Sequence, residues 1–91
     1  MNDTLLLRDQ FSVDDRTFTV LAEPWYDADV KEWRARYLYL PLDRSLPEIV
    51  SSAPVKRARR RDELIVLLAK STDRELTKAL RTVLPAAPRR A

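Results

Sequence analysis

The residues of this chain that could take part in chemistry are mostly cationic. Five positive charges fall within the six residues 56–61, which read Lys-Arg-Ala-Arg-Arg-Arg, and such a density of charge attracts phosphate groups. The sequence has no His, no Cys and no Gly. It therefore lacks the commonest general base, the thiol nucleophile, the usual soft metal ligands and glycine-built phosphate loops.

We expect this basic run to bind a polyanion, with nucleic acid as the leading candidate. Three further cations fall on one side of a predicted helix, because their spacing is i, i+4, i+7. The alternative is a solvated helix face whose arginine stems cover apolar surface. One detail favours binding: the run lies at or just before a helix start, where the helix dipole disfavours cations and a purely stabilising surface would place acidic residues. The predicted nucleic-acid-binding residues are Lys56, Arg57, Arg59, Arg60, Arg61, Arg74, Lys78 and Arg81.

The C-terminal helices also admit a helix-turn-helix interpretation, in which the second helix would enter a major groove. The intervening turn at Ser71-Thr72 lacks the glycine often found in that motif. An ordinary αα-hairpin explains the same residues, and this interpretation is preferred to the helix-turn-helix.

Aromatic residues offer a separate route to nucleic acid, because exposed rings stack on bases. Trp33 and Tyr37 fall at strand spacing and are expected in the core. The exposure of Trp25-Tyr26 is left open by the sequence. If both point outward beside Arg34 and Arg36, the sheet would form a platform for single strands.

Signals for catalysis or for a metal are weak. The carboxylates of Asp27, Asp29 and Glu32, with Glu23 nearby, are oxygen ligands suited to a hard cation. A dedicated cation loop usually needs a glycine for its sharp bend, so solubilising loop carboxylates explain these residues better. The Ser51-Ser52 pair has no His partner. We therefore predict no enzyme activity, no catalytic residues, no cofactor and no metal.

The composition indicates one small globular domain. Of the 91 residues, 45% are hydrophobic and 34% charged, which predicts a single α+β domain over residues 1–85 and a disordered basic tail over 86–91. No apolar run approaches the ~20 residues that span a bilayer, and the lack of Cys fits a reducing compartment. We expect a soluble cytoplasmic protein, of bacterial type by its composition, that does not contact membranes.

Charge is divided along the chain. Residues 1–45 carry a net charge of −3 and residues 46–91 carry +6. This asymmetry favours an anionic partner for the C-terminal half, or head-to-tail self-association.

The N-terminal half predicts an antiparallel meander over residues 5–40. Apolar and polar residues alternate on both sides of Asp14-Asp15, a pair that suits a two-residue hairpin turn. That turn would place Val13 opposite Arg16 and Phe11 opposite Phe18. The inner face would continue to Asp9 and Val20, and the outer face would carry Arg8, Gln10, Ser12, Thr17 and Thr19.

The second strand is predicted to end at Pro24, because proline cannot donate to a ladder, with a loop from Trp25 to Lys31. The third strand would cover Glu32–Leu40 and stop at Pro41. Its arginines should avoid the core, so Trp33, Ala35 and Tyr37 point inward. Leu38 and Leu40 then point outward and need a cover, either a short helix near Leu46 or a second protomer in a homodimer.

Residues beyond 43 change to helical spacing. Ser45-Leu46-Pro47-Glu48 and Thr72-Asp73-Arg74-Glu75 both match a capping box. The first predicts a short helix that stops before Pro54, and the second predicts a helix reaching about Leu84. Between them, Asp62–Lys70 carries an apolar helical stripe. The predicted fold is a three-stranded antiparallel β-meander followed by two or three C-terminal helices packed on one face. Its expected role is that of a non-enzymatic binding module, with a homo-oligomeric protein-interaction or structural subunit as the alternative.

Overall fold

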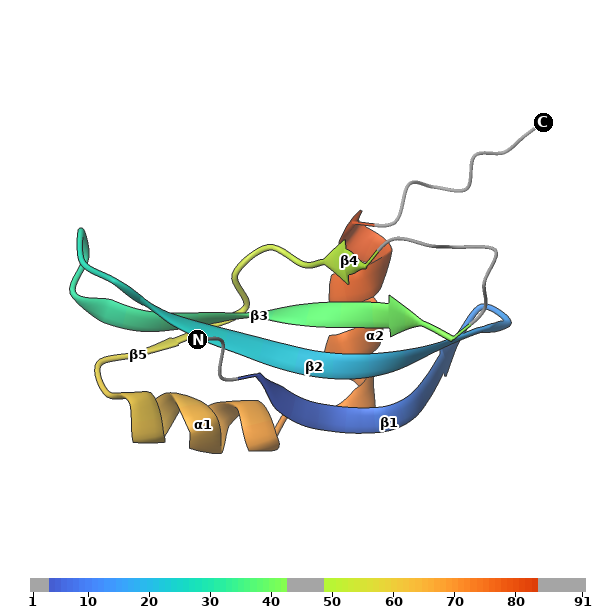
Figure 1. Cartoon of the computed structure of the whole chain (residues 1–91), viewed down its shortest axis with the longest axis horizontal. Coiled ribbons are helices and arrows are strands. Elements are labelled where there is room, and N and C mark those ends of the chain that lie inside the picture. The colour runs from blue at the N-terminus through green and yellow to red at the C-terminus, as the bar shows by residue number, and fades with distance from the viewer. Residues whose placement is uncertain (1–3, 43–48, 84–91) are drawn as a thin grey trace.

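The computed structural model describes residues 4–42 and 49–83. It is an α+β fold in which an antiparallel sheet carries two helices on one face (Figure 1). The strand order is β1-β2-β3-β4, and β5 also pairs with β3. The elements are β1 (Leu5–Val13), β2 (Arg16–Asp27), β3 (Glu32–Pro41), β4 (Val50–Ser51), β5 (Lys56–Ala58), α1 (Arg61–Ala69) and α2 (Asp73–Val83).

The β1–β2 hairpin forms in the predicted register. Val13 pairs with Arg16 and Phe11 with Phe18. Asp14 and Asp15 adopt φ angles of 52° and 66°, the left-handed values that a tight type I′ turn needs at both central residues. Aspartate tolerates this conformation better than most residues, which explains how a chain without glycine closes the turn.

Further along β1, the predicted alternation is wrong. Register shifts on both sides of Arg8 make it, rather than Asp9, the partner of Val20. Each shift adds one residue to β1. The shift between Arg8 and Phe11 leaves Asp9 exposed and turns Arg8 toward the helices, where its guanidinium donates to Asp73 Oδ1 and to the Ser71 carbonyl, both at 2.9 Å. Arg8 therefore ties the edge strand to the helical hairpin instead of facing outward.

Pro24 does not end β2, contrary to the prediction, and Trp25 and Tyr26 lie in a strand rather than a loop. Pro24 pairs with Ala35, whose carbonyl accepts from Val55 on the opposite side of β3. The missing N–H of Pro24 thus faces away from β3, at a point where β1 has already ended. The actual turn covers residues 28–31 and includes Lys31 at a φ of 55°.

The side chains of β3 alternate between the two faces of the sheet, as the sequence predicts. Ala35, Tyr37 and Tyr39 are buried on the inner face, and Trp33 is half-buried beside them. Burial raises the pKa of Tyr39 above its ordinary value, with a smaller contribution from Tyr37, and its phenol donates to the Leu76 carbonyl at 2.7 Å. The outer face, which neither described helix covers, carries the alternate residues, including Leu38 and Leu40.

The segment before α1 forms two short strands, the first of which lies where the sequence predicts a short helix ending before Pro54. Val50–Ser51 pairs with β3 as β4, and Lys56–Ala58 pairs with it as β5. Between them, the backbone N–H groups of Ser52 and Val55 donate to the carbonyls of Tyr37 and Ala35. Pro54 disfavours helical backbone in the residue before it, and the open edge of β3 supplies hydrogen-bond partners instead. The basic run is therefore a sheet edge leading into a helix.

The two helices complete the core. Leu64 and Leu68 of α1 and Leu76 and Leu80 of α2 are fully buried in one cluster with the inner face of the sheet. The Thr72 capping box is confirmed: Thr72 Oγ1 accepts from Glu75 N at 3.2 Å, and Glu75 Oε1 accepts from Thr72 N at 2.9 Å.

Several predictions fall outside the described residues. They are the Ser45–Glu48 capping box with Leu46, the helix end at Leu84 and the tail over 86–91. Within residues 4–42 and 49–83, neither helix has the length and apolarity that crossing a bilayer requires.

Candidate polyanion-binding surface

The eight predicted binding residues do not form one compact patch. Lys56 and Arg57 belong to β5, Arg59 and Arg60 connect it to α1, and Arg61 is the first residue of that helix. The other three are exposed on α2 and are Arg74, Lys78 and Arg81.

Three of these cations bind acidic side chains of the protein itself. Lys56 Nζ lies 3.1 Å from Glu75 Oε2, Arg81 Nη2 lies 3.0 Å from Asp14 Oδ1, and Arg60 Nε lies 3.5 Å from Asp62 Oδ1. Four others, Arg57, Arg59, Arg74 and Lys78, have no ion pair to any residue in the described ranges. These four are the cations most available to an external anion.

A directly facing pair of arginines involves a residue outside the predicted set. Arg34 of β3 and Arg57 of β5 are direct register partners, on the outer face because their neighbours Ala35 and Lys56 face inward. A cavity of about 230 Å³ is lined by both arginines together with Pro54, Val55 and Lys56. We call Arg34, Arg57 and Arg59 the arginine edge.

Arg34 is only partly satisfied by the protein. Its Nη1 donates to Asp27 Oδ2 at 3.3 Å, whereas its Nε is buried and has no hydrogen-bond partner in the described part of the chain. Asp27 pairs with Arg34 alone, so Arg57, which faces Arg34 across the ladder, has no carboxylate partner in the described residues. The alternation in β3 indicates that Arg34 lies on the outer face, but it does not indicate that Arg57 is its register partner.

Next to the arginine edge, the outer face carries an aromatic ring. Trp25 is the register partner of Arg34 on its other side. The Arg36 guanidinium lies over the Trp25 ring, with Cζ 5.9 Å from the ring centroid, and its Nε donates to Glu23 Oε1 at 2.7 Å. Trp25, Arg36 and Glu23 together line a depression of about 330 Å³.

Tyr26 does not share this face, because adjacent strand residues point to opposite sides. Its ring lies 5.7 Å from that of Trp33 in an edge-to-face arrangement. The sequence predicts a platform for single strands if both Trp25 and Tyr26 point outward, and of these two residues only Trp25 lies on the outer face.

The middle of the outer face is apolar. Leu6, Leu21 and Leu38 are successive register partners on β1, β2 and β3, and Leu6 is 60% exposed. Leu40 lies on the same face, two residues beyond Leu38. We call these four residues the leucine row.

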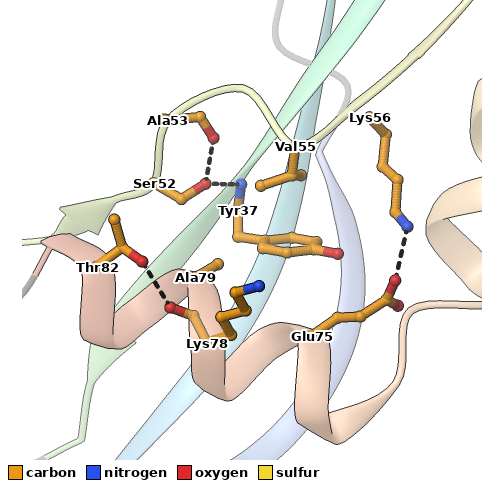
Figure 2. A pocket seen from close by; sticks show the side chains of 9 residues that line it. All are labelled: Tyr37, Ser52, Ala53, Val55, Lys56, Glu75, Lys78, Ala79 and Thr82. Carbon is orange, nitrogen blue, oxygen red and sulfur yellow. Dashed lines mark hydrogen bonds and ion pairs between the residues drawn. The ribbon is translucent and has the colours of Figure 1, made fainter.

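A further groove of about 370 Å³ separates α2 from the segment joining β4 and β5 (Figure 2). The Tyr37 ring lies at its centre, and the Lys56–Glu75 ion pair crosses one end. The hydrogen bond from the Thr72 backbone N–H, followed by that from Lys56, lowers the pKa of Glu75. Lys78 and Thr82 line the α2 side.

This groove places Ser52 in the neighbourhood of a lysine, but its hydroxyl is used locally. Ser52 Oγ donates to the Ala53 carbonyl at 2.7 Å and accepts from the Tyr37 N–H at 2.9 Å. These two bonds fix the link between β4 and β5 against β3. The arrangement accounts for Ser52 as a structural residue.

Two of the acidic residues near the second turn, Asp27 and Glu23, likewise bind other groups of the protein. Asp27 Oδ1 accepts from the Asp29 N–H at 3.0 Å, and its other oxygen holds Arg34. Glu23 holds Arg36. In the ranges that the structure describes, no three acidic side chains gather in a way that would hold a metal ion.

No protein-family model, no curated protein and no solved structure gives a significant match to this chain.

Proposed function

We propose that this protein is a small non-enzymatic binding module for a polyanion, with nucleic acid as the preferred ligand, and that the arginine edge is its principal contact. The observation that carries the proposal is the direct juxtaposition of Arg34 and Arg57 across β3 and β5. Like charges directly opposite each other on a sheet are destabilising. An anion that bridges them relieves this repulsion.

The chemistry of the edge suits phosphate. A guanidinium presents several N–H donors in a plane and binds phosphate oxygens through paired hydrogen bonds. Asp27 compensates one of the two facing charges, so a positive surplus remains, and the exposed Arg59 adds to it two residues later. The cavity between the arginines gives an anion room to approach both.

The other predicted cations have a secondary part in this proposal. Arg74 and Lys78 are exposed on α2 and have no acidic partner in the described residues, so they strengthen the positive field around the molecule. Lys56, Arg60 and Arg81 already bind carboxylates. Their contribution to phosphate binding would first require those ion pairs to open.

A salt series tests this proposal. Binding of labelled DNA and RNA fragments, followed by fluorescence anisotropy, should weaken as salt rises, with a log–log slope of roughly −0.7 to −0.9 for each phosphate neutralised. Arg57→Gln combined with Arg59→Gln should flatten the slope by about two phosphate contacts. Arg16→Gln combined with Lys70→Gln is the matched control, because both side chains are exposed and lie away from the arginine edge.

The result that contradicts the proposal is simple to recognise. Wild-type protein that binds neither DNA nor RNA at low salt would remove polyanion binding as its function. Equal effects of the two double substitutions would show that net charge matters and the arginine edge does not.

The leucine row supports a second candidate, a structural subunit that self-associates through its outer face. An apolar row beside the oppositely charged Glu23 and Arg36 is self-complementary, as a two-fold contact between identical surfaces requires. Sedimentation equilibrium should then give twice the monomer mass, and Leu38→Ser should restore the monomer. Val66→Ser, at an exposed position on α1, is the control. A pure monomer at high concentration would eliminate this candidate.

A further inference from the structure

We propose that the outer face of the sheet binds single-stranded nucleic acid, with Trp25 stacking on a base while Arg34 and Arg57 hold adjoining phosphates. This inference rests on the function proposed above and narrows the polyanion to an unpaired strand. It uses a constellation to which the basic run contributes only Arg57.

The three side chains are aligned by the sheet itself. Trp25 pairs with Arg34, and Arg34 pairs with Arg57, so they occupy one line across β2, β3 and β5. Neighbouring strands lie about 4.8 Å apart, so the backbone of Trp25 lies about 5 Å from that of Arg34 and about 10 Å from that of Arg57. A base and its own phosphates are joined through a single sugar and need recognition groups at this kind of separation.

The Trp25 ring already holds a planar cation. The guanidinium of Arg36 lies over it and is held by Glu23. Bases stack on both aromatic rings and arginine planes, so the depression formed by these three residues offers a nucleobase two surfaces of suitable chemistry. Neither described helix packs on this face, which leaves the line open to a ligand.

An unpaired strand fits this face better than a duplex does. Bases in a duplex are stacked on one another, so an aromatic ring reaches their faces only after costly unstacking. The major groove admits a helix or a two-stranded ribbon, whereas this constellation lies on the face of a wider sheet. Charge complementarity also favours a nucleic acid, because Asp27 is the only carboxylate in the described residues that pairs with either Arg34 or Arg57.

Binding competition tests the inference. The probes are a labelled single-stranded DNA of roughly 16 nucleotides, the upper site size of a small single-strand binding fold, the same sequence as a duplex, and inorganic polyphosphate. Trp25→Ala should weaken binding of the single strand by about 5- to 150-fold, the loss expected for one base stack. Its affinity for polyphosphate should stay unchanged, because polyphosphate has no bases.

A spectroscopic readout checks the same contact without removing it. The variant Trp33→Phe leaves Trp25 as the sole tryptophan. Its fluorescence should be quenched by the single strand and left unchanged by polyphosphate. Trp25→Phe keeps an aromatic ring and should retain part of the affinity, which guards against a fold defect in the alanine variant.

The outcomes separate this inference from the function on which it rests. Binding of polyphosphate, duplex and single strand alike, with no effect of Trp25→Ala, would leave polyanion binding in place and overturn the single-strand platform. Failure of all three probes to bind at low salt would overturn both.

Discussion

The phenol oxygen of Tyr37 lies 2.7 Å from the hydroxyl oxygen of Ser71, and both residues are buried. Tyr37 is in the middle of β3, and Ser71 is in the turn between α1 and α2. This hydrogen bond therefore fixes the corner of the helical hairpin to the centre of the sheet. Arg8 reaches the same turn from β1 through the Ser71 carbonyl.

Removing either partner of that bond should destabilise the domain. Tyr37→Phe leaves the Ser71 hydroxyl buried without this partner, and we expect a loss of about 1–3 kcal/mol in the free energy of unfolding. Urea denaturation measures it. In a double-mutant cycle, Ser71→Ala should cost much less in the Tyr37→Phe background than in the wild type, and purely additive losses would show that the bond contributes nothing.

Phe18→Ala should cost about 3–5 kcal/mol, because it opens a cavity in a well-packed core. Phe18 is fully buried, opposite Phe11 and edge-to-face with Tyr39 at 6.0 Å between ring centroids. Leu6→Ala, at an exposed position on the other face, is the control and should change stability by less than about 0.5 kcal/mol. A loss below about 1 kcal/mol for Phe18→Ala would contradict the packing described for this face.

Thr72→Ala removes the side chain that caps α2 and should lower the free energy of unfolding by about 0.5–2 kcal/mol. Thr72→Ser keeps a hydroxyl at the cap and should restore most of this loss. The measurement is the denaturation midpoint at constant denaturant slope. An unchanged midpoint in Thr72→Ala would mean that the Glu75 half of the capping box is sufficient.

The stabilising contribution of Glu75 should depend on pH. Its pKa is lowered in the folded protein from an ordinary value of 4.5, so the contribution is complete above that value and is lost as the pH falls through the lower folded one. Glu75→Gln should therefore destabilise the protein near neutral pH, and the difference from wild type should disappear in strong acid. A difference that does not change with pH would show that the ionised carboxylate is not responsible.

The features of the fold that the sequence predicts correctly depend on neighbours along the chain. The Asp14-Asp15 pair sets the hairpin register because the two turn residues themselves accept left-handed backbone. Thr72 and Glu75 are only three residues apart, so their reciprocal hydrogen bonds are encoded locally.

The errors arise where the outcome depends on distant segments. Pro24 is tolerated in β2 because β1 has ended beside it, and no local pattern reveals that endpoint. The shifts around Arg8 are hidden by Leu5-Leu6-Leu7, which fits either face. The segment 50–58 becomes sheet because β3 offers it an unpaired edge.

Dependence on distant segments also limits how much of the candidate site the sequence predicts. The density of charge at 56–61 draws attention to the basic run, yet the facing pair joins Arg57 to Arg34, more than twenty residues earlier in the chain. The register of a three-residue strand decides this pairing. Sequence alone places Arg34 on the outer face and cannot supply its neighbour.

The irregular edges of this sheet have a consequence for its behaviour at high concentration. A regular, unpaired strand edge recruits the strands of other molecules and begins aggregation. Here the register shifts interrupt β1. Where β2 extends beyond β1, Pro24 has no backbone N–H to donate. The opposite edge is divided between two very short strands, β4 and β5. The cationic side chains of β5 would repel those of the same strand in a second molecule. Growth of fibrils by edge-to-edge addition is thereby discouraged at both sides of the sheet.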